Sequence, residues 1–145
     1  MYIHELHQVN QEVIEAFQRL IPQLSSRSKS PSNEDLLAMA EADGTFVFLA
    51  RRGDKEMEIV GSATLATFQT PTGVHGWIED VVVDEAARKQ GIGRALTQAC
   101  IDKAREIGLK DVNLTSRPGR VAANRLYKAM GFVQRETNVY RYALN

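Results

Sequence analysis

Two adjacent carboxylates, Glu79 and Asp80, interrupt an apolar run that has the composition of a β-strand. Trp77 and Ile78 precede the pair and Val81 follows it, so burial would remove hydration from a carboxylate and raise its pKa. A carboxylate with a raised pKa can accept a proton near neutral pH, as a general base does. Side chains alternate between the faces of a regular strand, so Glu79 and Asp80 cannot both point at one site. The structural alternative for either residue is a salt bridge to a neighbouring strand.

A short basic loop with two glycines follows the same strand. In Arg88-Lys89-Gln90-Gly91-Ile92-Gly93 the apolar strand gives way to an amphipathic helical pattern. The first amides of a helix have no intrahelical acceptor and the helix dipole is positive there, so this loop is a candidate anion site. Gly91 and Gly93 allow the backbone to approach a ligand closely, and Arg94 adds positive charge. The alternative is a loop that only caps the helix.

The spacing within this loop excludes two common phosphate-binding motifs. The dinucleotide motif G-x-G-x-x-G needs a third glycine where this chain has Leu96. A P-loop needs Gly-Lys-Ser/Thr, and Gly93-Arg94-Ala95 has neither the lysine nor the hydroxyl. The pattern therefore favours a pyrophosphate cradle of a different kind.

The periodicity of the chain predicts the elements that position these residues. We expect a strand over 74–83, a helix over 91–107 and a short strand over 111–115, which together form a right-handed crossover with the loop at the carboxyl end of the first strand. Asn33 is expected to cap a helix that runs through Ala42. The other expected elements are strands over 2–7, 46–51 and 58–69, helices over 13–24 and 122–130, and a final hairpin over 132–144.

Two separated motifs in this order resemble the GNAT superfamily of N-acetyltransferases. The first is Val-Val-Val-Asp at 81–84 followed by Arg88-x-x-Gly91-x-Gly93, and the second is Asn124-x-x-Tyr127 with Gly131-Phe132. The resemblance implies an α/β GNAT-type fold over one domain, residues 1–145. Its mixed, mostly antiparallel sheet would have about seven strands and about four flanking helices, in the order β-α-α-β-β-β-α-β-α-β-β.

The resemblance also implies acetyl-CoA as the acetyl donor and assigns residues to it. The pantetheine arm would lie like an extra strand beside Val81, Val82 and Val83, in a splayed sheet, and Asn124 would bind the same arm. The pyrophosphate would lie on the amides of seven residues: Arg88, Lys89, Gln90, Gly91, Ile92, Gly93 and Arg94.

Direct transfer to an amine needs a base for the amine and an acid for the leaving thiolate. Spacing alone favours a core role for Tyr127, whereas the family motif places a tyrosine here near the sulfur, and on that motif Tyr127 is the candidate acid. A Glu-Asp pair precedes the cofactor strand in the polyamine and glucosamine-6-phosphate branches of the family, where the glutamate acts through water. We therefore predict Glu79 as the base, with Asp80 as the alternative.

Composition and charge exclude several classes of protein. A net charge of zero argues against a general nucleic-acid binder, and no 18-residue apolar run exists to cross a membrane. The N-terminus lacks a secretory pattern and Cys100 is the single cysteine, so a cytoplasmic location is expected. Cys100 lies on an apolar helix face and is expected to pack rather than react. His4, His7 and His75 lack metal-ligand spacing, so no metal is expected.

The acceptor is not defined by any motif, but charge gives a direction. Residues 1–72 carry 6 basic and 10 acidic side chains, and residues 73–145 carry 12 and 8. The acidic first half favours a cationic acceptor such as a polyamine, an amino acid or a peptide N-terminus. A basic cluster can hold the adenosine 3′-phosphate, an acidic group of the acceptor or only solvent, and comprises Arg117, Arg120, Arg125 and Lys128.

Two further hypotheses remain open at the level of sequence. The alternative function is a non-catalytic acyl-CoA-binding module, against which the retention of Glu79 and Tyr127 argues. Homodimers are common in the family, but no residue pattern in this chain indicates one.

Overall fold

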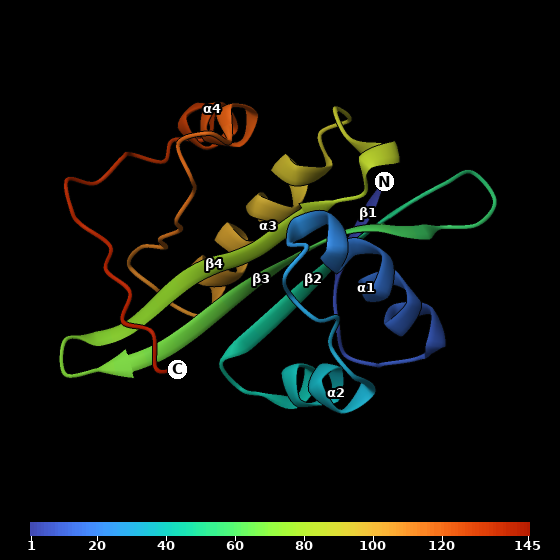
Figure 1. The fold of residues 1–145 in the computed structure, drawn as a ribbon, viewed down its shortest axis with the longest axis horizontal. Helices are drawn as coiled ribbons and strands as arrows, with labels where there is room; N and C mark the ends of the chain where they lie inside the picture. Colours follow the sequence, from blue (N-terminus) through green and yellow to red (C-terminus); the bar gives the residue numbers. More distant parts are fainter. The chain divides into compact units, whose positions relative to one another are not determined.

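A computed structural model describes residues 1–145, which form two compact units, Met1–Thr115 and Ser116–Asn145. Each unit is described by itself. The first contains every strand and three of the α-helices; the second contains one helix, α4 (Val121–Ala129) (Figure 1). In chain order the first unit comprises β1 (Tyr2–Glu5), α1 (Gln11–Leu24), α2 (Asn33–Glu41), β2 (Thr45–Arg52), β3 (Glu58–Thr70), β4 (Gly73–Val83), the 3₁₀ helix η1 (Glu85–Ala87) and α3 (Ile92–Glu106).

The strands form one antiparallel sheet in the order β1-β2-β3-β4. The expected number of helices, about four, is confirmed, but the expected number of strands, about seven, is wrong: the sheet has four. Neighbours in sequence are neighbours in the sheet, so each strand is joined to the next by a hairpin or by the α1–α2 segment. β4 is therefore an edge strand, and it leads directly into the basic loop.

Helices cover both faces of this sheet. On one face, α1 and α2 pack Val13, Phe17, Leu20 and Leu36 into a core with side chains of the strands, among them Val47, Leu49, Ile59 and Val82. On the other face, α3 buries Ile92, Leu96 and Cys100 against the strands. Apolar residues recur at three- and four-residue spacing in both α1 and α3, which turns one stripe of each helix toward the sheet. The loop between β4 and α3 is thus held between two rigid elements.

Side chains of the residues that precede α1 and α2 cap the first turns of these helices. Asn10 precedes α1 and its side chain accepts from the amide of Val13 at 3.0 Å. The expected cap of α2, Asn33, is wrong by one residue. Ser32 accepts from the amide of Asp35, whose carboxylate accepts in return from the amide of Ser32, and this reciprocal pair satisfies two donors where Asn33 would satisfy one.

Two strands expected from sequence are absent as regular elements. Of 111–115, only Asn113 pairs, in a parallel bridge with Trp77: its amide donates to Gly76 and its carbonyl accepts from Ile78. The parallel direction is as expected, but the pairing ends after one bridge. The expected hairpin over 132–144 is also wrong. Its β-branched and aromatic residues favour a strand, yet a strand needs a partner ladder, and Val139, Tyr140, Tyr142 and Leu144 are 76–90% exposed.

Candidate active site

The Glu79-Asp80 pair lies at an irregularity of β4. Thr64 of β3 pairs with Glu79 and Ser62 pairs with Val82, so two residues of β4 oppose the single residue Ala63 of β3. This is a β-bulge, and Asp80 adopts a left-handed conformation within it, with φ of 53°. Apart from glycine, asparagine and aspartate adopt this conformation most readily, and β-bulges occur where a strand re-aims a side chain.

The bulge affects the prediction that Glu79 and Asp80 point to opposite faces of the strand. Strict alternation along a strand would place the two carboxylates on opposite faces, but the extra residue breaks the alternation at this pair. Both side chains are exposed. Partial burial of its carboxylate nevertheless raises the pKa of Glu79, and the neighbouring negative charge of Asp80 raises it further.

The outer edge of β4 is open beside the next residues. The only pairing on that side is the bridge at Trp77, and no strand pairs with the outer edge of Val81, Val82 or Val83. Val82 packs inward against the α1 and α2 core. Backbone groups on an unpaired edge can bind an extended ligand while the side chains pack, which is the arrangement expected for a pantetheine arm.

The loop from Arg88 to Gly91 has the geometry of an anion cradle. It follows η1 and contains two left-handed residues, Lys89 with φ of 64° and Gly91 with φ of 80°. Gly91 is the residue that precedes α3, and no side chain caps that helix. A Cβ added at Gly91 would meet no atom within 4 Å, so the space in front of the first amides of α3 is open. The residues present therefore fit a diphosphate.

The charged side chains of the loop differ in how they are held. Arg88 donates from Nε to the carbonyl of Val83 at 3.1 Å, and Gln90 accepts a hydrogen bond from Arg52 of β2. None of the ion pairs in the structure involves Arg88, Lys89 or Arg94. The positive charge of the loop is thus not neutralised by carboxylates of the chain.

Asn124 and Tyr127 lie in the second unit, on α4. The side-chain amide of Asn124 donates to the carbonyl of Arg117 at 2.9 Å and so holds the loop before α4. Tyr127 is buried and stacks edge-on against Phe132, with the ring centroids 5.6 Å apart. Glu79 lies in the first unit and Tyr127 in the second, and it stays a prediction that both side chains act on the same acetyl-CoA. The basic side chains of the second unit, Arg117, Arg120, Arg125 and Lys128, are exposed.

The remaining sequence candidates have structural roles. Cys100 is fully buried, and burial raises the pKa of its thiol to about 12, so the thiol is protonated at neutral pH. The three histidines have separate partners: Arg51 donates to His4, His7 pairs with Glu5, and His75 bonds to Thr70. None of the helices is both long and apolar enough to cross a membrane.

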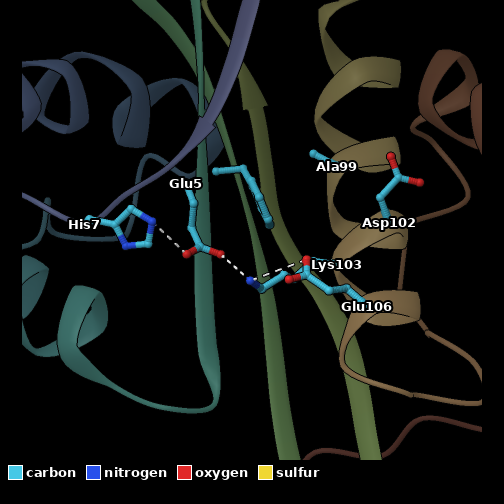
Figure 2. A pocket seen from close by; sticks show the side chains of 7 residues that line it. Glu5, His7, Ala99, Asp102, Lys103 and Glu106 are labelled. Carbon is cyan, nitrogen blue, oxygen red and sulfur yellow. Dashed lines mark ion pairs between the residues drawn. The ribbon is translucent and has the colours of Figure 1, made fainter.

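Two surface pockets lie away from the cradle. In the first, between β1 and α3, charged side chains contact one another: Glu5 contacts both His7 and Lys103, at 3.0 and 3.2 Å, and Lys103 also pairs with Glu106 (Figure 2). The second lies between α1 and the β2–β3 hairpin, where Arg51 contacts Glu12 at 2.6 Å. Neither pocket contains a residue expected to do chemistry, so we base the candidate site on β4 and the cradle.

Sequence reasoning missed the side chains that hold the cradle from outside. Arg19 and Gln23 of α1 contact Asp84 and Glu85, at the entrance of the loop, and Arg52 contacts Gln90 within it. These partners are 38 to 65 positions apart in the chain. No local pattern marks them, and only the packing of α1 and β2 beside the end of β4 brings them together.

Comparison with known proteins identifies the family. The model of the acetyltransferase (GNAT) family matches residues 6–132. A curated relative, N-alpha-acetyltransferase 30 of Schizosaccharomyces pombe, is 34% identical over 74 residues, which are 51% of this chain and about half, 49%, of the relative.

Solved structures show the same fold. An acetyltransferase from Trypanosoma brucei has a TM-score of 0.74 at 25% identity, covering 98% of this chain and 99% of that one. An aminoglycoside acetyltransferase from an uncultured soil metagenomic sample, in complex with sisomicin, has a TM-score of 0.82 at 20% identity, covering 99% and 96%. With a family model that covers β2 to β4, the loop before α3, and α4, the chain belongs to the acetyltransferase (GNAT) family, whose members take their acetyl group from acetyl-CoA.

Proposed function

We propose that this chain transfers the acetyl group of acetyl-CoA directly to a primary amine. The observation that carries the proposal is the open, uncapped start of α3, which follows the strand that holds Glu79 after η1 and the basic loop. A diphosphate over Gly91 and an extended arm along Val81 to Val83 would bring the thioester toward the Glu79 bulge. The family match supports the donor.

The proposed reaction needs no covalent enzyme intermediate. Glu79, through a water molecule, takes a proton from the ammonium form of the acceptor, and the amine nitrogen then attacks the thioester carbonyl carbon. The C–N bond forms, the carbonyl oxygen becomes anionic, and that oxyanion collapses with cleavage of the C–S bond. Tyr127 gives its phenolic proton to the departing thiolate, and the nitrogen loses its second proton to water, which leaves the neutral amide. Exchange with solvent then returns a proton to the phenolate of Tyr127 and removes the first proton from Glu79. The raised pKa of Glu79 supports its part, because a carboxylate of higher pKa is a stronger base.

A cationic acceptor suits the acidic balance of residues 1–72. Two of the similar proteins are described as an N-alpha-acetyltransferase and as an aminoglycoside acetyltransferase, and both names indicate an amine acceptor. We therefore include a polyamine, free amino acids, a peptide with a free N-terminus and an aminoglycoside in the acceptor panel.

The test is release of free coenzyme A from acetyl-CoA over that panel, measured with a thiol reagent. Because Cys100 is the only cysteine and is buried with a pKa of about 12, the native protein adds little background to such an assay. Amine-dependent thiol release is expected with at least one acceptor. Folded protein that binds no coenzyme A in a calorimeter would refute the proposal, and binding without turnover on any amine would favour the non-catalytic module.

A further inference from the structure

The entrance of the cradle is held by an arginine of α1. Arg19 donates from Nε to Oδ2 of Asp84 at 3.1 Å and from Nη2 to the carbonyl of Ile59 at 2.5 Å. Asp84 is the first residue after β4, and Ile59 lies near the start of β3. One guanidinium therefore connects the helix, the sheet and the start of the loop, using donors that lie in a fixed plane.

Asp84 transmits this contact into the loop. Its second carboxylate oxygen, Oδ1, accepts from the amide of Ala86 at 3.1 Å, and its own amide donates to the carbonyl of Val60 at 2.8 Å. The Asp84 side chain is 17% exposed, so its charge is only partly hydrated and depends on the guanidinium for compensation. Asp84 is thus the residue that starts η1 and directs the chain toward Arg88.

A second side chain of α1 reinforces the same place. Gln23, one helical turn after Arg19, accepts from the amide of Glu85 at 2.8 Å and donates to the carbonyl of Arg19 at 3.2 Å. Two consecutive residues at the entrance of the loop, Asp84 and Glu85, are therefore bound by two side chains on one face of α1.

We propose that Arg19 is a positioning residue for acyl-CoA binding. The inference rests on the proposed function and deepens it. After η1, the loop reaches α3 through the two left-handed residues, without regular structure of its own. Its amides converge on a diphosphate only if the start of the loop is fixed, and Arg19 fixes it through Asp84. Arg19 itself does not touch the phosphates.

The chain offers a matched control. Arg51 of β2 also ties α1 to the sheet: it contacts Glu12 at 2.6 Å and the carbonyl of Met57 at 2.8 Å. Like Arg19, it is partly buried and spans two elements, but its contacts lie at the other end of α1 and include no residue of the cradle. Loss of the Arg51 contacts therefore shows how far a weaker attachment of α1 to the sheet by itself changes coenzyme A affinity.

The experiment compares Arg19→Met with Arg51→Met in the full chain. Methionine keeps an unbranched apolar side chain about as long as the arginine stem and removes the guanidinium donors, while Phe17 and Leu20 still anchor α1 in the core. Calorimetry with coenzyme A is expected to show about tenfold weaker binding for Arg19→Met and less than about twofold change for Arg51→Met, at similar losses of melting temperature. The KM for acetyl-CoA should rise in parallel, with kcat at saturation nearly unchanged.

Two further variants keep the test decisive. Arg19→Lys retains the charge but cannot contact Asp84 and Ile59 at once, so an intermediate loss of affinity is expected, and this variant replaces Arg19→Met if the latter fails to fold. Asp84→Asn combined with Arg19→Met should weaken binding less than the product of the single effects, because both changes break one contact.

The outcomes separate the two claims. Coenzyme A affinity of the Arg19 variants within about twofold of wild type, or an equal loss in Arg51→Met, overturns the positioning role and leaves the proposed function intact. Absence of binding in the wild-type protein overturns the proposed function, and the positioning role with it.

Discussion

Substitution of alanine for Gly91 tests the placement of the phosphates, because the chain contains a nearly identical glycine elsewhere. Gly91 precedes α3 and Gly108 follows it, with φ of 80° and 83°. A Cβ at either position meets no atom within 4 Å. Gly91→Ala and Gly108→Ala therefore impose the same backbone strain with no steric clash in the unliganded protein, and they differ only in which end of α3 carries the new methyl group.

The expected loss of stability is the same for both variants. A left-handed conformation costs an L-residue about 1–2 kcal/mol, and the smaller freedom of the unfolded chain offsets about 0.4–1 kcal/mol of it. Each variant should thus lose about 1 kcal/mol of unfolding free energy, which lowers the melting temperature of a chain of this size by about 2–4 °C.

The expected loss of affinity is confined to Gly91→Ala. A methyl group that keeps a phosphate oxygen from one amide removes a charge-assisted hydrogen bond, worth about 1.5–3 kcal/mol, or about 10- to 150-fold in Kd. Titration calorimetry with coenzyme A measures this directly, and thermal unfolding of the same samples confirms that the two variants are equally destabilised.

Either of two results would refute the reasoning. If both variants lose stability but bind coenzyme A as wild type does, no phosphate lies over Gly91. If Gly108→Ala weakens binding as much as Gly91→Ala, the loss reports strain in α3 rather than a contact with the ligand. A pair with glutamate at the same positions extends the test, since Gly91→Glu adds like charge at the cradle and its loss of affinity should exceed that of Gly91→Ala.

Further predictions concern Glu79, Tyr127 and Cys100. Because burial and Asp80 raise the pKa of Glu79 above its ordinary value of 4.5, kcat/KM should rise with pH through that raised pKa, and Glu79→Gln should lower turnover and abolish this acid limb in a pH–rate profile. The folded chain holds the Glu79 proton more tightly than the unfolded chain, so ionisation of this carboxylate lowers the stability of the fold as pH rises above its unfolded pKa. Thermal unfolding should therefore show Glu79→Gln to be at least as stable as wild type at neutral pH. A clear destabilisation would contradict the raised pKa of Glu79. Tyr127→Phe should reduce turnover about 10²- to 10⁴-fold with coenzyme A affinity nearly unchanged, and full activity would remove Tyr127 from the mechanism. Cys100→Ala should remain active while losing stability through the cavity left in the core, as chemical denaturation would show; loss of activity in the folded variant would instead indicate a covalent route.

Sequence patterns predicted the elements whose side chains repeat regularly. The apolar spacing of α1 and α3 and the β-rich runs before Val83 gave elements within a few residues of those observed, because burial on one face imposes the period. The loop before the start of α3 was also predictable, since a strand, a glycine loop and a helix start follow one another in the chain, while phosphate binding at Arg88–Gly93 stays a prediction.

The rest depends on contacts that no local pattern encodes. Whether 132–144 forms a ladder depends on a partner strand, and the structure provides none, although the residues favour one. The bulge at Asp80 depends on how β4 aligns with β3, and alternation was assumed where the register shifts. The contact of Arg19 with Asp84 spans 65 positions and follows only from the way α1 crosses the sheet.

The bulge in β4 has a consequence for attempts to redirect the enzyme to new acceptors by random mutagenesis. Surface positions usually tolerate most amino acids, and Asp80 is exposed. Its left-handed backbone, however, admits asparagine or glycine readily and disfavours every β-branched residue. Stability selection from a library that saturates Asp80 is therefore expected to favour aspartate, asparagine and glycine for reasons of backbone conformation alone, whereas Trp77, in regular pairing with Ala66, can be varied freely by that criterion. At Asp80, the backbone conformation of the strand restricts which amino acids can be selected before their side-chain chemistry does.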